Sequence, residues 1–218
     1  MIQVAIAEDH TVFREMLSES LDKKKDIEVI IGAANGSDLI AQMRSKVPEI
    51  VLLDLHMPVM DGPAALEIIR SEFPSVKVII LSLQYSDIHV RKYMKLGARG
   101  YLCKDVEFEK VVKAIRDVDN LGYYFFDKVS PDLIAELVED NTIAPGSSGR
   151  PPEELTTREI EIIQQLFDQN TNQEIAENLN ISVRTVHNHR INITRKTGSK
   201  NVVGVLLYAI KHGLTPVK

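Results

Sequence analysis

The first 120 residues alternate short apolar runs with stretches of helical periodicity. The apolar runs at 2–7, 27–31, 49–54, 76–81 and 100–103 have the length and composition of buried β-strands. After each run, apolar residues recur every three or four positions, which predicts five helices, the last spanning about 107–118. Because parallel strands need crossover connections, the alternation predicts an α/β domain with a doubly wound, five-stranded parallel sheet.

Acidic, hydroxyl and basic residues stand where the predicted strands end. Glu8 and Asp9 follow the first strand, Asp54 ends the third, Ser82 follows the fourth and Lys104 follows the fifth. Ligands of open α/β sheets bind beyond the carboxyl ends of the strands, so we expect these side chains to share one pocket. Three carboxylates in one pocket suit Mg²⁺, and Asp54 is placed to act as a nucleophile toward a phosphoryl group.

The motifs around these residues resemble those of a known family. The similarity rests on Glu8-Asp9, on Asp54 followed by Met57-Pro58 and Asp61-Gly62, on Ser82, and on Tyr101-Leu102-Cys103-Lys104-Asp105. Together they resemble the flavodoxin-like receiver domain of two-component response regulators. The resemblance implies that Asp54 accepts a phosphoryl group from a sensor histidine kinase. It also implies that Mg²⁺ is held by Glu8, Asp9, Asp54 and the backbone carbonyl of His56, that Lys104 and Ser82 contact the phosphoryl oxygens, and that Tyr101 is an aromatic switch residue.

Each of these assignments has a simpler structural alternative. Asp9 could cap the first helix, and Lys104 could be a solvated lysine at the end of a strand. Ser82 could be a loop hydroxyl and Tyr101 an ordinary core aromatic. The histidines at 10, 56 and 89 lack the spacing of metal ligands, so we expect them to be surface or loop residues.

The middle of the chain reads as a connection between two domains. Four aromatic residues cluster at 123–126 and are expected to pack back on the preceding domain. A short helix is predicted at 130–140 with Ser130 as its N-cap, and 141–152 has the turn-forming composition of a linker. The predicted organisation is a receiver domain at 1–120, a connecting segment and linker at 121–152, and a second domain at 153–218.

Residues 153–218 predict a small all-α domain. Thr156 with Glu159, and Thr171 with Glu174, have the spacing of capping boxes at two helix starts. The first helix is expected to bury a stripe formed by Ile160, Ile163, Leu166 and Phe167. Ser182 is the expected N-cap of a third helix that ends near 197, and a fourth helix follows 201. Two short helices joined by a tight turn, the second of them basic, indicate a helix-turn-helix.

Charge points to an anionic partner for this second domain. The formal charge of the whole chain is −5, yet no acidic residue follows Glu177, whereas seven Lys and Arg residues do. One face of the domain should therefore be positive.

The second domain resembles the LuxR-type helix-turn-helix, and with the receiver-like domain it places the chain among proteins similar to NarL/FixJ-type response regulators. The similarity rests on Leu155-Thr156, Arg158-Glu159, Glu174-Ile175-Ala176, Ile181-Ser182, Thr185-Val186 and His189. It implies double-stranded DNA as the partner and a recognition helix at about 182–197. By this resemblance His187, Asn188 and Ile191 face the major groove, while Arg184, Thr185, Lys196 and Lys200 touch phosphates. Members of the family often have lysine where His187 stands, so the base preference stays open.

Oligomeric state and compartment follow from these expectations. A single short recognition helix reads few base pairs, so specificity favours a homodimer on two half-sites, with RNA polymerase as a further partner to consider. The chain has a single cysteine, no signal-like N-terminus and no apolar stretch of about 18 residues, which favours a cytoplasmic location.

Two other classes of function compete with DNA binding. An aspartyl phosphatase or phosphotransferase also begins with a strand-end nucleophilic Asp, but the position of its usual general acid is occupied here by His56. A phosphorelay protein would bind a protein target and not DNA. Separately, 153–218 could be a helical dimerisation domain whose basic face is only solvated. We interpret the chain as a transcription regulator, not an enzyme, in which phosphorylation of Asp54 controls dimerisation and sequence-specific DNA binding.

Overall fold

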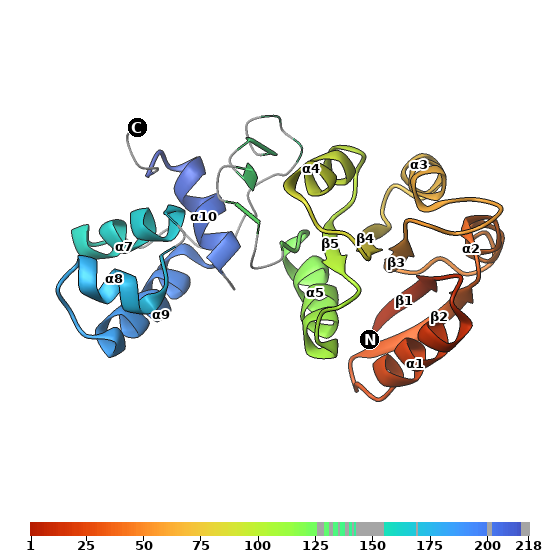
Figure 1. Cartoon of the computed structure of the whole chain (residues 1–218), viewed down its shortest axis with the longest axis horizontal. Coiled ribbons are helices and arrows are strands. Elements are labelled where there is room, and N and C mark those ends of the chain that lie inside the picture. Colours follow the sequence, from red (N-terminus) through yellow and green to blue (C-terminus); the bar gives the residue numbers. More distant parts are fainter. Residues whose placement is uncertain are drawn as a thin grey trace. The chain divides into compact units, whose positions relative to one another are not determined.

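The chain forms two compact units. The computed structural model describes residues 1–125, 129–130, 133–134, 136–137, 140, 142, 155–168, 170–199 and 202–214. One unit comprises Met1–Asp127 and the other Lys128–Lys218 (Figure 1). No helix among the described residues has both the length and the apolar character needed to cross a membrane.

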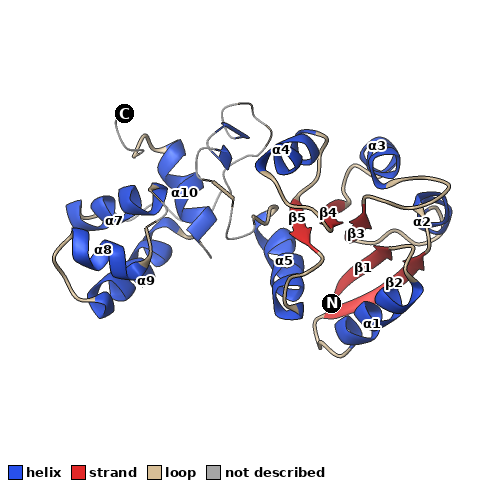
Figure 2. Ribbon diagram, viewed as in Figure 1, coloured by secondary structure: helices blue, strands red, loops and turns tan. Residues whose placement is uncertain are grey.

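The first unit is built on a five-stranded parallel sheet. Its strands are β1 (Ile2–Ala7), β2 (Ile27–Ala33), β3 (Ile50–Asp54), β4 (Lys77–Ser82) and β5 (Gly100–Cys103). They lie side by side in the order β2-β1-β3-β4-β5 (Figure 2). The order reverses between β1 and β3, which confirms the doubly wound topology expected from the sequence and makes the carboxyl ends of these strands the expected ligand site.

Helices cover both faces of the sheet. They are α1 (Thr11–Asp22), α2 (Gly36–Met43), α3 (Gly62–Glu72), α4 (Asp87–Lys95) and α5 (Phe108–Leu121). Figure 1 shows α1 and α5 on one side and α2, α3 and α4 on the other. On the α1–α5 side, Leu21 and Ile115 are fully buried in one cluster with Ile6, Leu52 and Ile79 of the strands. Alternate strand residues face the other helices, so both faces of the sheet are dry, as a parallel sheet requires.

The segment after α5 returns to the sheet, as the sequence predicted. Gly122 ends α5 with a φ of 85°, a left-handed conformation that glycine adopts without strain. Tyr124 then bridges to Gly100, and its backbone N–H donates to the carbonyl of Arg99 at 2.8 Å. The side chains of Tyr124 and Phe125 are almost fully buried.

Only part of the predicted connecting helix falls within the described residues. Residues 133–134 and 136–137 are helical, and the hydroxyl of Ser130 accepts a hydrogen bond from the N–H of Leu133 at 3.3 Å, in agreement with Ser130 as the N-cap. The predicted linker at 141–152 lies outside the described residues except for Thr142.

Among the residues described from 155 onward, the second unit has four helices with their own core. They are α7 (Thr157–Phe167), α8 (Asn172–Asn178), α9 (Val183–Thr197) and α10 (Val202–Lys211). Both predicted capping boxes are present, and Ser182 caps α9 as expected. Asn180 closes the turn between α8 and α9 with a φ of 52°, a conformation that asparagine tolerates well.

The predicted buried stripe of α7 is partly wrong. The helix buries Ile162, Ile163 and Leu166 together with Glu159, whereas Ile160 and Phe167 are only half-buried. The helix is therefore rotated relative to the predicted stripe. Its orientation is set by packing against α9 and α10 and by a charged contact of Glu159, which periodicity alone does not report.

Candidate functional site

An acidic pocket lies at the carboxyl ends of β1, β3 and β5. Glu8 follows β1, Asp54 ends β3 and Lys104 follows β5. The ammonium of Lys104 lies 2.7 Å from Oε2 of Glu8 and 2.9 Å from Oδ2 of Asp54. Three residues far apart in the sequence therefore meet in one cluster, as the strand-end pattern predicted.

The cluster is nearly closed to solvent. The side chain of Glu8 is fully buried, that of Asp54 is 4% exposed and that of Lys104 is 10% exposed. Burial alone would lower the pKa of Lys104, but the hydrogen bonds and negative charges of Glu8 and Asp54 outweigh it, and the pKa is raised. Lys104 is therefore a permanent cation, which offsets the cost of burying two carboxylates.

The loop after Asp54 is held close to the carboxylate. The N–H of His56 donates to Oδ1 of Asp54 at 3.3 Å. The N–H of Gly62 donates to the carbonyl of Leu55 at 3.1 Å. A Cβ on Gly62 would lie 2.3 Å from the carbonyl oxygen of Asp54, so only glycine permits this approach.

The same loop contains a backbone conformation that is unusual for a β-branched residue. Val59 has a φ of 67°, and the N–H of Met60 donates to the carbonyl of Pro58 at 2.7 Å across it. This three-residue hydrogen bond is a γ-turn with positive φ, which is a strained arrangement. The loop between Asp54 and α3 therefore carries backbone strain beside the acidic pocket.

His10 joins the two acidic residues that precede it. Its Nδ1 lies 3.1 Å from Oε1 of Glu8 and 3.1 Å from Oδ1 of Asp9, and its N–H donates to Oε1 of Glu8 at 3.2 Å. His10 is an exposed loop residue, as expected, and its ring also contacts both carboxylates. Sequence reasoning missed this contact because it considered the spacing of the histidines from one another and not from the acidic pair.

The first three residues after β1 form a cluster able to hold a cation. Carboxylate oxygens of Glu8 and Asp9 lie within 4.8 Å of each other and of a ring nitrogen of His10. Oε2 of Glu8 and Oδ1 of Asp9 are buried, and they contact Lys104 and His10 respectively. Asp9 does not cap α1, because the N-cap is His10.

Ser82 at the end of β4 and Tyr101 of β5 both contact Gln84 in the loop that follows β4. The hydroxyl of Ser82 accepts from the N–H of Gln84 at 3.2 Å, and its carbonyl accepts from the N–H of Lys104 at 2.7 Å. The hydroxyl of Tyr101 donates to the carbonyl of Gln84 at 2.6 Å, and burial is the main cause that raises the pKa of Tyr101. Tyr101 is thus a core residue and is also tied to the loop that follows Ser82.

Cys103 lies beneath the same loop. It is 8% exposed, and its thiol donates a long hydrogen bond to the carbonyl of Leu83 at 3.7 Å. Burial is the main cause that raises the pKa of the Cys103 thiol. A buried, protonated thiol is unreactive.

The second unit presents one polar face of α9. The predicted groove residues His187, Asn188 and Ile191 are exposed, as is Arg184. Thr185 is half-buried, and its hydroxyl lies 2.7 Å from that of Ser182 at the helix N-cap. The exposed positions continue at Val183, Asn192 and Arg195. These three share the helical spacing of the predicted contacts and could have been found from it.

Of the predicted phosphate contacts, Lys196 is engaged within the second unit and Lys200 is not described. Nζ of Lys196 lies 2.8 Å from Oε2 of Glu159, and the side chain of Lys196 is 15% exposed. The lysine thus connects α9 to the start of α7. Lys200 lies outside the described residues.

Comparisons with known proteins agree with this architecture. Residues 4–116 match the response regulator receiver domain, and residues 153–209 match the bacterial regulatory proteins of the luxR family. Transcriptional regulatory protein DegU of Brevibacillus brevis is 31% identical over 227 residues, covering 100% of this chain and 96% of DegU. Oxygen regulatory protein NreC of Staphylococcus aureus is 32% identical over 214 residues, covering 98% of this chain and 99% of NreC.

Solved structures show the same relationship. The receiver domain of a putative response regulator NarL from Mycobacterium tuberculosis has 29% identity and a TM-score of 0.51, covering 53% of this chain and 94% of that domain. A structure of RcsB dimers bound to DNA shares the fold at 22% identity, with a TM-score of 0.53, covering 95% of this chain and 96% of that chain. The chain belongs to the transcriptional response regulators that combine a receiver domain with a LuxR-type helix-turn-helix domain.

Proposed function

We propose that Asp54 accepts a phosphoryl group from a sensor histidine kinase and that this modification controls DNA binding by the second unit. The observation that supports it best is the contact of the Asp54 carboxylate with Lys104 at the carboxyl end of β3. One oxygen of Asp54 pairs with the ammonium and the other accepts from a backbone N–H. Lys104 can pair with an incoming phosphoryl group, because it carries a permanent charge beside the acceptor.

The donor set fits Mg²⁺. Carboxylate oxygens of Glu8 and Asp9 lie within 4.8 Å of each other, and such hard oxygen donors suit this cation. Glu8, Asp9, Asp54 and the carbonyl of His56 are the proposed ligands. Bound there, Mg²⁺ would neutralise phosphoryl charge.

Ser82 and Tyr101 connect the acceptor to the rest of the receiver in this proposal. Both contact Gln84, through the Ser82 hydroxyl and the Tyr101 hydroxyl. A phosphoryl oxygen that draws the hydroxyl of Ser82 toward Asp54 would compete with its contact to Gln84. The loop after β4 would then favour a second arrangement, which is a shift between two populations.

The proposed domains are a receiver at 1–120, a connecting segment at 121–152 and a DNA-binding domain at 153–218. We place His187, Asn188 and Ile191 in the major groove, with Arg184, Thr185, Lys196 and Lys200 at phosphates. The active form is a homodimer on two half-sites about one helical turn apart, roughly 10 bp. The dimers of RcsB on DNA support this assembly. In this proposal the protein acts in the cytoplasm, where it binds DNA. RNA polymerase is a further proposed partner.

Phosphoryl uptake tests the acceptor. The full chain is incubated with acetyl phosphate and Mg²⁺, and intact mass spectrometry counts the phosphoryl groups gained. Asp54→Asn should gain none. Asp61→Asn is the matched control because Asp61 is exposed in the same loop and asparagine preserves its cap on Ala64. Uptake by Asp54→Asn at the wild-type rate would show that another residue is the acceptor.

Ultracentrifugation with a duplex titration tests the output. Phosphorylation should increase the dimer fraction and tighten binding to a two-fold-related site. The proposal that phosphorylation regulates DNA binding is wrong if phosphorylation changes neither the mass in solution nor the affinity for DNA.

A further inference from the structure

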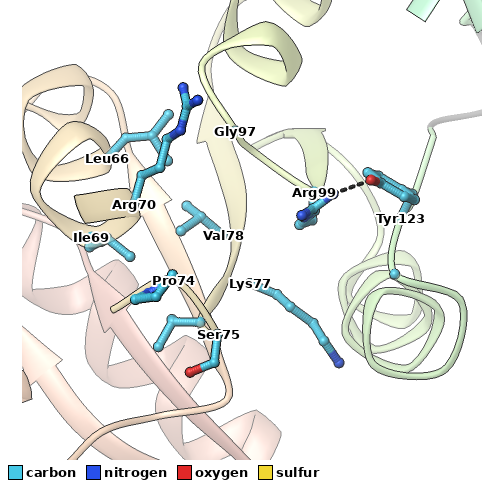
Figure 3. A pocket seen from close by; sticks show the side chains of 12 residues that line it. Leu66, Ile69, Arg70, Pro74, Ser75, Lys77, Val78, Gly97, Arg99 and Tyr123 are labelled. Carbon is cyan, nitrogen blue, oxygen red and sulfur yellow. Dashed lines mark hydrogen bonds between the residues drawn. The ribbon is translucent and has the colours of Figure 1, made fainter. Parts of the chain in front are cut away.

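A second pocket lies at the end of the sheet opposite Asp54. It is a cavity of about 350 Å³ between the C-terminal half of α3, the start of β4 and the residues after α5 (Figure 3). We call it the basal pocket, and its defining residues are Arg70, Lys77, Arg99 and Tyr123, with Ile69 and Val78 in its apolar wall. Its volume lies in the range of small-molecule sites, roughly 300–1,000 Å³.

Three cationic side chains line the basal pocket, and one of them has an acidic partner. Nζ of Lys77 lies 3.0 Å from Oδ1 of Asp119 and donates to the Asp119 carbonyl at 3.0 Å. Within residues 1–125, Arg70 and Arg99 have no carboxylate at ion-pair distance. The pocket therefore carries an excess of positive charge on two guanidinium groups, whose planar geometry suits carboxylate and phosphate.

Neighbouring residues contact the guanidinium group of Arg99 and the stem of Arg70. The guanidinium of Arg99 lies 4.7 Å from the ring centroid of Tyr123, and it donates a hydrogen bond to the Tyr123 hydroxyl (Figure 3). The stem of Arg70 passes over Gly97, where a Cβ would lie 3.2 Å from Cδ of Arg70. Preorganised donors lose less conformational entropy on binding a ligand.

The wall of the basal pocket combines polar and apolar surface in similar measure. Ile69 and Val78 line it and are otherwise buried in the sheet–helix interface. Tyr123 adds an aromatic ring beside Arg99. A site with two guanidinium groups and a partly apolar wall matches a ligand with an anionic head and a compact apolar body.

We infer that the basal pocket binds a small organic anion, a carboxylate or phosphate ester with an apolar body. The site is independent of phosphoryl transfer at Asp54. Bound anion would tie Arg99 and Tyr123 together where the chain leaves α5. Tyr124, the next residue, bridges to Gly100, so the ligand would stabilise the start of the connecting segment.

Binding of phenyl phosphate to the full chain tests this inference. Titration calorimetry in Mg²⁺-free buffer should show one site, weaker for inorganic phosphate and absent for phenol. Arg70→Gln and Arg99→Gln should each weaken binding about tenfold or more, the loss expected for one charge-assisted hydrogen bond. Lys113→Gln removes the same charge from an exposed position of α5 and should leave the affinity unchanged.

Amide chemical shifts identify where the probe binds. Saturating phenyl phosphate should shift the amide signals of Gly97 and Gly122, and thermal melts should show that Arg70→Gln, at an exposed position, stays folded. Arg70→Lys, which keeps the charge but not the planar fork, should bind with intermediate affinity. The inference is overturned by the absence of saturable binding, by equal affinity for inorganic phosphate, or by shifts confined to α9 or to the loop after Asp54.

Discussion

Glycine at position 62 is a steric requirement of the acidic pocket. The carbonyl oxygen of Asp54 and Cα of Leu55 would lie 2.3 Å and 2.8 Å from an added Cβ. Gly62→Ala should therefore lower the free energy of unfolding by about 2 kcal/mol or more, because both obstacles are backbone atoms. Urea unfolding measures the loss, and phosphoryl uptake should fall with it.

Gly32→Ala is the matched control. A Cβ on Gly32 would meet only Cδ of Arg14 at 3.9 Å. The substitution should be neutral or slightly stabilising. Equal losses at positions 32 and 62 would contradict the steric explanation.

Val59 offers a substitution that should stabilise the protein. Its φ is 67° and its side chain is 88% exposed, so valine contributes strain and little packing. Asparagine tolerates this conformation, and Val59→Asn should raise the free energy of unfolding by about 1 kcal/mol. Chemical unfolding checks the value.

The same exchange at a helical position serves as its control. Val12 is 80% exposed in α1, where valine and asparagine have similar helix propensities. Val12→Asn should leave the stability nearly unchanged. A Val59→Asn variant that is less stable than the wild type would show that the turn is not strained.

At the scale of elements, the ion pair of Glu159 and Lys196 joins α7 to α9. Burial alone would raise the pKa of Glu159, but hydrogen bonds from Lys196 and Thr156 outweigh it and hold the pKa below its ordinary value. A lowered pKa stabilises the fold above the unfolded-state value, about 4.3 for glutamate. This contribution to stability is lost as the pH falls below the unfolded-state pKa and through the lower pKa of folded Glu159.

Removing the lysine should reverse this pH dependence. Lys196→Met leaves Glu159 buried without its cation, which should cost about 3 kcal/mol at pH 7. The deficit relative to wild type should shrink as the pH falls, because protonation removes the buried charge. Circular dichroism melts at several pH values measure it. Arg195→Met, at an exposed position of α9, should show no such trend.

The exposed face of α9 predicts separate roles for its side chains. Asparagine reads adenine through two hydrogen bonds in the major groove, so Asn188→Ala should reduce discrimination at one base pair by about 1–3 kcal/mol. Arg184→Gln should weaken binding to all sequences alike and lower the salt dependence by about one phosphate contact. Duplex titrations at several salt concentrations separate these effects. Loss of sequence preference in Arg184→Gln would contradict the assignment.

The sheet and the acidic pocket could be predicted because the sequence features that indicate them lie close together in the chain. Each apolar run ends in the residue that carries the chemistry, and parallel strands bring those ends together. The contact of His10 with the acidic pair that precedes it was missed because only the spacing among the histidines was considered. The pair of Glu159 with Lys196 was not predicted, because it depends on how α7 and α9 are rotated about their axes. The exposed sides of Ile160 and Phe167 have the same origin, because packing against α9 and α10 selects the face of α7.

At the scale of the whole molecule, the two units have separate cores. The second unit buries Ile163, Ile175, Val186 and Ile193 among its own helices. Deleting residues 1–150 should therefore leave a folded domain that binds DNA more weakly than the phosphorylated full chain and does not respond to acetyl phosphate. Circular dichroism and duplex titration check both expectations. An unfolded fragment would show that these helices need the residues removed by the deletion, either the receiver or 128–150.

The buried position of Cys103 makes the protein suited to distance measurements between its units. The chain has one cysteine, and its thiol is covered by the loop after β4. Two cysteines introduced at exposed positions, one in each unit, would be the thiols that react with a spin label or a fluorescent dye. Spectroscopy on such a doubly labelled chain could follow how the units move when Asp54 is modified, without first removing a native residue.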